Sequence, residues 1–519
     1  MKVVVVGAGV GGLAVAARLA AQGHAVELHE RSATHGGKLG EFRRDGFAFD
    51  TGPSLLTMPQ VFEELFADTG GPSGLDVVPV DPACRYRFAD GTTLDLPHDP
   101  AEIPAALDAA LGPGTGASWL ALHARSARLW DLVGDAVLRR PLDGAADLLR
   151  FSLRLRDLRL IAPWRSLRRL GTATFADPRL RAWLDRYATY SGSDPRRTPS
   201  VLSVTSYVEQ HFGAWYVRGG LRRIADALLE RCAALGVRVH LASAVAQVRT
   251  DDRGVCGVRL ADGTDVAADV VVCDADASVL YGGLLRHRAS ARVARSLRRA
   301  QPSLSGFALL LALDGYEPGP AHRVFFPRDY DAEFDATLGR APVPVADPAI
   351  YVHAPDDPAL RPDDASQGWF VLVNAAPHDP ARGVDWDAPG LAQRYADLVL
   401  ERLAERGTDV RDRIRWREVR TPADLERATG APGGAIYGTA SHGPRAALLR
   451  PANRSPVPGL YLVGGSAHPG GGLPLVVLSA AIVAEMIGWA PRTSPGGGGR
   501  VRARLRWRGR GSRTRGRTP

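Results

Sequence analysis

The amino-acid sequence predicts an α/β fold with a Rossmann-like nucleotide-binding domain, an antiparallel-sheet domain and a helical subdomain. A glycine motif follows a short apolar run at the N-terminus, and a second glycine cluster separates an apolar strand from an apolar helix near the C-terminus. Between them, short apolar runs typical of strands alternate with links rich in proline and glycine. A chain of 519 residues also exceeds what one hydrophobic core usually contains, so several domains are expected.

The N-terminal segment "KVVVVGAGVGGLAVAARLAAQGHAVELHE" has the order strand, turn, helix, strand. Its G-x-G-x-x-G motif consists of Gly7, Gly9 and Gly12. Glycine at position 9 lets the backbone approach a pyrophosphate, and the N-terminus of the following helix favours that anion. The second strand ends at Glu30, whose carboxylate can accept hydrogen bonds from ribose hydroxyls and would repel a 2′-phosphate. The motif therefore predicts a site for NAD or FAD rather than NADP.

The following residues distinguish the two dinucleotides. In "RSATHGGKLGEFRRDGFAFDTGPSLLTMP", Gly37 and Lys38 follow the second strand, and a later strand runs into a turn at Pro53 and Ser54. This stretch resembles the FAD-dependent oxidoreductases of the amine oxidase superfamily, and most closely the bacterial phytoene desaturases (carotenoid desaturases), in which "GGK…GF.FD.GP…TMP" recurs. The resemblance implies that these residues lie beside FAD, with Gly37 and Lys38 near its phosphates and ribityl chain. A chance surface lysine remains the alternative for Lys38.

The C-terminal segment "GLYLVGGSAHPGGGLPLVVLSAAIVAEMI" predicts a strand, a glycine-rich turn and a helix with proline in its first turn. Glycines allow a flat ring system to approach, and the helix N-terminus would favour negative charge on a reduced ring. The segment resembles the desaturase pattern "LY.VG..THPG.G.P…S". The flavin neighbours that this resemblance implies are Gly464, Gly465, Ser466, Pro474 and Leu475. His468 is either a catalytic acid or base or a structural residue of the turn.

The middle of the chain resembles the same family less specifically. Residues 215–277 resemble the segment that returns the chain to the FAD sheet, with Val245 at the adenine end; Asp274 stands where that family usually has asparagine. Residues 147–170 combine apolar side chains with arginines, as in a helix at a membrane interface or a surface helix with a solvated arginine face. The expected domains are an FAD-binding domain (1–75, 213–298 and 420–490), a substrate-binding sheet domain (76–109 and 299–419), a helical, membrane-facing subdomain (110–212) and a disordered tail (491–519).

The positive charge of the chain is concentrated in this tail. Nine of its arginines fall in residues 494–519, which contain no acid, so that the rest of the chain holds 56 basic and 56 acidic residues. The tail predicts binding to an anionic membrane surface rather than to specific nucleic acid. No apolar run is long enough to span a membrane, and the four cysteines show no CxxC pair, which argues against a disulfide framework or a metal site. We expect a cytoplasmic protein at the inner face of the membrane.

The resemblance implies an FAD-dependent oxidoreductase that introduces double bonds into a carotenoid or other isoprenoid chain, with hydride transfer to flavin N5 and oxygen or a quinone as electron acceptor. A carotenoid 3,4-desaturase or another carotenoid-modifying flavoenzyme is an alternative. An FAD-dependent amine oxidase is a second alternative. Such enzymes commonly hold a lysine beside flavin N5, and some attach the flavin through a C-terminal cysteine, but here no lysine follows Lys38 and no cysteine follows Cys273. A non-catalytic isoprenoid-binding protein is a third, and the intact glycine motif with Glu30 argues against it.

Overall fold

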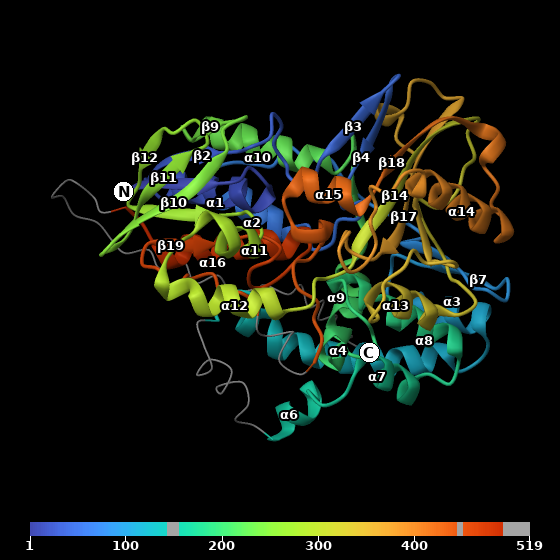
Figure 1. Ribbon diagram of the computed structural model, residues 1–519. Helices are drawn as coiled ribbons and strands as arrows, with labels where there is room; N and C mark the ends of the chain where they lie inside the picture. The colour runs from blue at the N-terminus through green and yellow to red at the C-terminus, as the bar shows by residue number, and fades with distance from the viewer. Residues whose placement is uncertain (143–154, 444–449, 491–519) are drawn as a thin grey trace, which may run out of the picture.

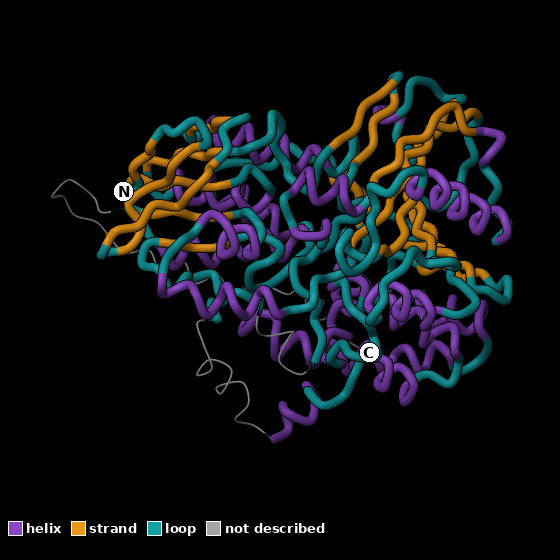
Figure 2. The backbone as a smooth tube through the Cα atoms, viewed as in Figure 1, coloured by secondary structure: helices purple, strands orange, loops and turns teal. Residues whose placement is uncertain are grey.

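The chain folds around a five-stranded parallel sheet and a seven-stranded mixed sheet (Figures 1 and 2). A computed structural model describes residues 1–142, 155–443 and 450–490. The parallel sheet has the order β19-β13-β1-β2-β9, and every neighbouring pair is parallel. Its strands are β1 (Lys2–Val6), β2 (Ala25–His29), β9 (Arg238–His240), β13 (Val270–Cys273) and β19 (Leu460–Leu462). The strands predicted before the two glycine motifs therefore belong to one sheet, which confirms the predicted α/β class.

Helices cover one face of this sheet, and the other face packs mainly against a small antiparallel sheet and the segment after β13. The helices include α1 (Val10–Ala21), α2 (Gln60–Asp68), α10 (Arg222–Ala234) and α16 (Leu473–Ile487), and α1 packs against both α10 and α16. At Gly12 a Cβ atom would lie 2.0 Å from the carbonyl oxygen of Gly7. Only glycine lets α1 approach the end of β1 this closely. An antiparallel sheet of β10 (Val245–Asp251), β11 (Gly254–Leu260) and β12 (Asp265–Ala267) lies beside β13.

The seven-stranded sheet has the order β18-β14-β17-β16-β15-β6-β7, and only β15 and β6 pair in parallel. Its strands are β6 (Cys84–Arg87), β7 (Thr93–Leu96), β14 (Ser305–Asp314), β15 (His322–Phe325), β16 (Ile350–His353), β17 (Ser366–Ala375) and β18 (Ile414–Arg420). Leu309 packs toward α14 (Leu391–Glu405), whereas Leu310 packs against the hairpin of β3 (Glu41–Arg44) and β4 (Phe47–Asp50). Because both faces are covered, β14 is apolar along almost its whole length.

A group of helices packs below the seven-stranded sheet in the view of Figure 1. It contains α3 (Ile103–Leu111), α4 (Thr115–Val137), α6 (Leu155–Ile161), α7 (Leu167–Thr174), α8 (Pro178–Arg186), α9 (Val204–Phe212) and α13 (Tyr330–Leu338). The remaining elements include β5 (Val77–Pro79), β8 (Trp215–Val217), α11 (Ala277–Val279), α12 (Ala291–Arg299) and α15 (Pro422–Thr429). The predicted division of the chain into domains stays a proposal.

The prediction of one helix over residues 147–170 is wrong in its described part. The chain leaves the helical conformation after Ile161, and α7 begins only at Leu167. Pro163 lacks a backbone N–H and disfavours helical geometry at the preceding residue, and Ala162 has a φ of 43°. Residues 147–154 of this prediction lie outside the described residues, as does the predicted tail at 491–519.

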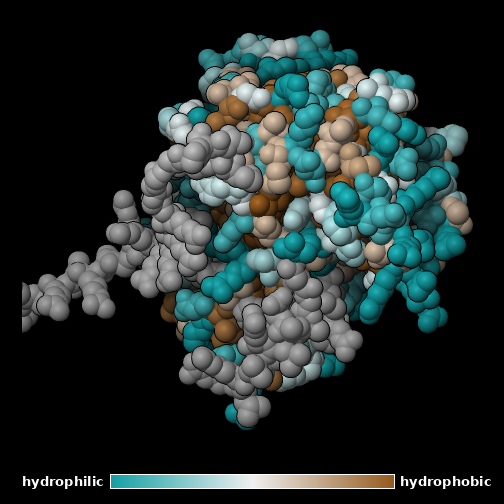
Figure 3. Space-filling model, turned by 90° about the vertical axis from the view of Figure 1, so that its left-hand side faces the viewer, coloured by the Kyte–Doolittle hydropathy of each residue, from teal (hydrophilic) through white to brown (hydrophobic). Residues whose placement is uncertain are grey.

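The end of the molecule that carries the N-terminus has a mostly hydrophilic surface. In the space-filling view of the end that carries the N-terminus, apolar side chains form small patches between polar ones (Figure 3). Few large apolar side chains are exposed in the described parts of the chain; they are Met1, Leu120, Trp164, Leu241, Val343 and Trp489. Among the helices that the structure describes, none has the length and hydropathy needed to cross a membrane.

Candidate active site

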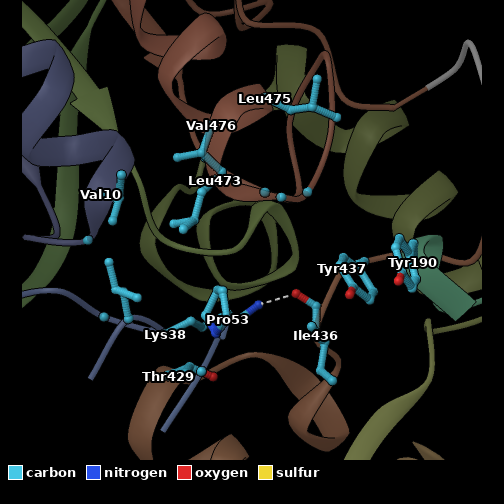
Figure 4. A pocket seen from close by; sticks show the side chains of 18 of the residues that line it. Val10, Lys38, Pro53, Tyr190, Thr429, Ile436, Tyr437, Leu473, Leu475 and Val476 are labelled. Atoms are coloured by element: carbon cyan, nitrogen blue, oxygen red, sulfur yellow. Dashed lines mark hydrogen bonds between the residues drawn. The ribbon is translucent and has the colours of Figure 1, made fainter. Parts of the chain in front are cut away.

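A cavity of about 1120 Å³ lies between the parallel sheet, the seven-stranded sheet and the helices (Figure 4). Both glycine turns line it. The predicted cofactor residues that line the cavity are Gly7, Gly9, Glu30, Gly37, Lys38, Pro53, Ser54, Val245, Gly464, Gly465, Ser466, Pro474 and Leu475. Gly12 is the exception, because it lies against the end of β1 instead. The structure thus brings residues from both ends of the chain into one site.

The side chain of Asp274, a residue directly after β13, lies between the two glycine turns. A Cβ atom at Gly9 would lie 2.4 Å from Asp274 Oδ2, and one at Gly11 or Gly464 would lie 2.4 Å from Oδ1. These segments follow β1, β13 and β19, so they meet at the carboxyl ends of parallel strands. Ligands of open α/β sheets bind at this edge. Glycine is required here because any larger side chain would occupy the same space.

Burial raises the pKa of Asp274 to about 7. The negative charge of Glu30 raises it further, whereas the backbone N–H groups of Gly12 and Gly9 and the charge of Lys38 act against this rise. The carboxyl group is therefore protonated in mildly acidic solution and charged in alkaline solution. The sequence marked Asp274 as a departure from the asparagine of related proteins, and the structure places that departure inside the glycine turns.

Glu30 holds the first glycine turn through its two carboxylate oxygens. The N–H of Ala8 donates to Oε2 at 2.7 Å, and the N–H of Ser32 donates to Oε1 at 2.8 Å. Each carboxylate oxygen has more than one acceptor position, so Glu30 retains acceptors for ligand hydroxyls on the side that lines the cavity. The carboxylate is thereby oriented before a ligand binds.

Lys38 joins the N-terminal segment to the loop after α15. Its Nζ donates to the carbonyl oxygens of Ile436 at 2.6 Å and Ala435 at 3.2 Å (Figure 4). Burial lowers the pKa of this lysine, and the nearby Asp276 and Asp274 act against that lowering. Lys38 lines the cavity with its ammonium group fixed by the protein, so the alternative of a chance surface lysine is wrong.

Arg450 fixes the opposite side of the same loop. Its Nη1 donates to the carbonyl oxygens of Tyr437 at 2.7 Å and Gly465 at 2.9 Å, and burial lowers its pKa to about 10. Ser466 accepts a hydrogen bond from the N–H of Ala277 at 2.9 Å and so ties the second glycine turn to α11. Sequence reasoning missed Arg450, because nothing in its neighbourhood distinguishes it from the many other arginines.

His468 is buried beneath the second glycine turn. Its Nε2 lies 2.9 Å from the carbonyl oxygen of Val137 and 3.0 Å from that of Arg140. Carbonyl oxygens only accept, so Nε2 carries a proton that is already engaged. This arrangement favours the structural interpretation of His468 over the catalytic one.

Comparison with known proteins identifies the family of this site. A model of the family "Flavin containing amine oxidoreductase" matches residues 10–315. The chain belongs to this family. It is 36% identical to a 4,4'-diapolycopene oxygenase of Methylomonas sp., over 94% of this chain and 98% of that protein. It is 34% identical to a hydroxyneurosporene desaturase of Rubrivivax gelatinosus, over 94% of this chain and 93% of that protein.

A third relative is a zeta-carotene-forming phytoene desaturase of Myxococcus xanthus, which is 33% identical over 94% of both chains. Among solved structures, an oxidoreductase from Methanosarcina mazei has a TM-score of 0.62 at 18% identity, and the match covers 93% of this chain and 100% of that one. Putrescine oxidase also has a TM-score of 0.62, at 15% identity, over 94% of this chain and 99% of that one. The predicted resemblance is confirmed: the chain is an FAD-dependent oxidoreductase of the carotenoid desaturase type.

The residues present fit FAD. The N-terminus of α1 and the bare backbone around Gly9 suit a pyrophosphate. Glu30 suits ribose hydroxyls, and the glycine turn that precedes α16 admits a flat ring, since at Gly472 a Cβ atom would meet nothing within 4 Å. We propose that the predicted residues lining the cavity hold FAD in this way. When bound, FAD supplies the two-electron oxidation.

Several polar side chains at the other end of the cavity escaped prediction. They are Arg186, Tyr190, Glu209, His322, Tyr351 and Tyr437. In Figure 4, Tyr190 and Tyr437 lie on the side of the view away from Val10 and Lys38. The stretch 184–200, which resembles a family segment near a substrate channel, contains Arg186 and Tyr190, whereas His322 and Tyr351 belong to strands more than a hundred residues further along the chain. No local pattern in the sequence connects them.

Proposed function

We propose that the protein introduces double bonds into a carotenoid or related isoprenoid chain. The observation that carries this proposal is that one cavity contains both glycine turns and a long apolar wall. The apolar wall is formed by Trp130, Val133, Val137, Leu138, Val201, Leu202, Val204 and Val208, from α4, α9 and the turn before α9. Such a wall suits an apolar chain and excludes water from the reacting carbons.

The residues of this chain contribute mainly by positioning. Lys38 and Arg450 hold the loop at 435–437 from two sides, and this loop packs against the second glycine turn. Positioning of two neighbouring carbons against the cofactor provides much of the rate when those carbons already have allylic stabilisation. This account requires no strong base, which agrees with the engaged proton of His468.

Oxygenation of the chain is the second candidate reaction. One of the relatives is named an oxygenase, at 36% identity, and the same cavity suits its substrate class. Oxidation of a soluble amine is disfavoured, because no lysine follows Lys38 and no cysteine follows Cys273. Oxygen and a membrane quinone are both suitable electron acceptors.

Expression in a host that accumulates phytoene, followed by pigment analysis, tests this proposal. Desaturation removes two hydrogen atoms at each step and moves the absorption of the pigment to longer wavelengths. Oxygenation instead adds mass to the product. An unchanged pigment profile in cells that contain the FAD-loaded protein would contradict both reactions on this substrate.

We infer that the protein works at the inner, anionic face of a membrane, where such a substrate is dissolved. Trp164 is 66% exposed in the link between α6 and α7, beside Arg165. Tryptophan is enriched at membrane interfaces, and each arginine near an anionic surface contributes about 1 kcal/mol. The nine arginines of the tail would add to this attraction.

A further inference from the structure

The cavity contains a polar cluster that a pure hydrocarbon would not need. We define the Arg186 cluster as Arg186, Tyr190, Tyr351, His322 and Ser54, all of which line the cavity. They come from α8, the turn that follows it, β16, β15 and the turn after β4. The cluster therefore unites the helical group, the seven-stranded sheet and the N-terminal segment at one end of the apolar wall.

The tyrosines of the cluster are held firmly in place. Arg186 Nη1 donates to the hydroxyl of Tyr190 at 2.6 Å, and the guanidinium carbon lies 5.1 Å from the centre of that ring. The hydroxyl of Tyr351 lies 2.7 Å from both Ser54 Oγ and His322 Nδ1. Burial lowers the pKa of His322 to about 3, so this histidine is neutral. The positive charge of the cluster therefore resides on Arg186 alone.

Arg186 has no charged partner in the described part of the chain. The charge of Glu209 acts on the pKa of Arg186 only from a distance, because no carboxylate oxygen of the described residues lies within 4.0 Å of the guanidinium nitrogens. Glu209 instead accepts a hydrogen bond from Tyr187 at 2.7 Å; burial raises its pKa, whereas the bond from Tyr187 and the charge of Arg186 act against that rise. A guanidinium has five N–H donors, and one of them is engaged with Tyr190. The others face a cavity whose remaining wall is largely apolar.

A hydrocarbon chain against these donors would leave them without acceptors, which is costly in a site that excludes water. An oxygen on the chain end would accept from them. We propose that Arg186, oriented by Tyr190, binds an oxygen acceptor at one end of the isoprenoid substrate. The substrate class is then an oxygenated carotenoid rather than a pure hydrocarbon. This inference rests on the proposed function and adds the residue that selects the substrate.

A matched pair of ligands tests the inference. The dissociation constants of neurosporene and of its hydroxylated derivative are measured with the FAD-loaded protein, in the same detergent, by quenching of tryptophan fluorescence. We expect the hydroxylated ligand to bind about tenfold more tightly, as for one hydrogen bond to a charged group. In Arg186→Met this preference is lost, because the hydroxylated ligand binds about tenfold more weakly while neurosporene binds equally or more tightly.

Two further variants separate this role from general damage. Arg186→Lys keeps a donor and retains part of the preference. Arg181→Met makes the same chemical change on the same helix, where the side chain donates to the carbonyl oxygens of Phe175 and Ala176 outside the cavity, and the preference stays as in the parent. Flavin content is measured for each variant and is expected to match the parent.

Three results would overturn the inference. Equal affinity of the parent for both ligands would mean that water in the cavity accepts the hydrogen bonds of the Arg186 guanidinium. Equal weakening of both ligands in Arg186→Met would mean a structural role. Loss of flavin from Arg186→Met would mean that the guanidinium serves the cofactor. If neither ligand binds the parent, the proposed function itself fails instead.

Discussion

The ammonium group of Lys38 donates a hydrogen bond of 2.6 Å to the carbonyl oxygen of Ile436, almost four hundred residues further along the chain. This contact closes the cavity between the N-terminal segment and the loop after α15. It is half-buried, and it is charge-assisted on the lysine side.

Replacement of Lys38 by methionine should therefore loosen the cavity wall. We expect the free energy of unfolding to fall by about 2 kcal/mol, since two backbone carbonyls lose a charged donor. Flavin content should fall with it. The matched control is Lys2→Met, which removes the other lysine of the chain from an exposed position and should change neither quantity. Denaturant unfolding and flavin absorbance per protein give both values, and equal behaviour of the two variants would contradict this role of Lys38.

A side chain at Gly9 should abolish FAD binding. A Cβ atom there would lie 2.4 Å from Asp274 Oδ2, in the space between the two glycine turns. Gly9→Val is therefore expected to elute from gel filtration without flavin, while circular dichroism checks that it is folded. Gly282→Val is the control, because a Cβ atom at that glycine would meet nothing within 4 Å. Retention of FAD by Gly9→Val would show that the cofactor lies elsewhere.

Asp274 should make FAD binding depend on pH. Its pKa of about 7 means that the carboxyl group gains a negative charge between about pH 6 and 8, close to the turn that we assign to the pyrophosphate. The dissociation constant of FAD should then rise by about tenfold or more across this range in the parent. In Asp274→Asn the rise should be absent, and above pH 7 this variant should bind FAD more tightly. Isothermal titration calorimetry at pH 6 and pH 8 measures both.

The same group contributes to stability with a defined sign. Its pKa is raised from 3.8 in the unfolded chain to about 7 in the folded one, so its contribution is complete below about pH 4 and is lost as the pH rises through 7. Asp185 and Glu333 have pKa values raised in the same direction, so the quantity to compare is the difference between parent and Asp274→Asn. A pH-independent difference in unfolding free energy would contradict the raised pKa.

Deletion of residues 494–519 should weaken binding to anionic vesicles at low salt and leave flavin content unchanged. Each of the nine arginines contributes about 1 kcal/mol near such a surface, and salt screens this attraction. Co-sedimentation with anionic and neutral vesicles measures the effect. If the truncated protein sediments as the full chain does, the tail has no such role, and Trp164→Ser then tests the exposed link between α6 and α7.

The sequence predicted the parts of the site in which local pattern and ligand chemistry coincide. The spacing of Gly7, Gly9 and Gly12 before a helix needs no knowledge of the rest of the chain, and β1, α1 and β2 follow in the predicted order. The Arg186 cluster could not be predicted, because its members come from distant elements that meet only in the folded sheet. The prediction of one helix over 147–170 was wrong because it relied on the composition of the segment and disregarded Pro163, a residue that interrupts helices.

Anaerobic reduction of the flavin by a carotenoid in liposomes is the most direct test of the proposed function. The purified FAD-loaded protein is mixed with phytoene or hydroxyneurosporene in anionic vesicles, and with putrescine in buffer, while the flavin absorbance is recorded. We predict that a carotenoid bleaches the flavin and yields a product with two fewer hydrogen atoms, while putrescine leaves the flavin oxidised. Bleaching by putrescine and by no carotenoid would contradict the account and favour amine oxidation.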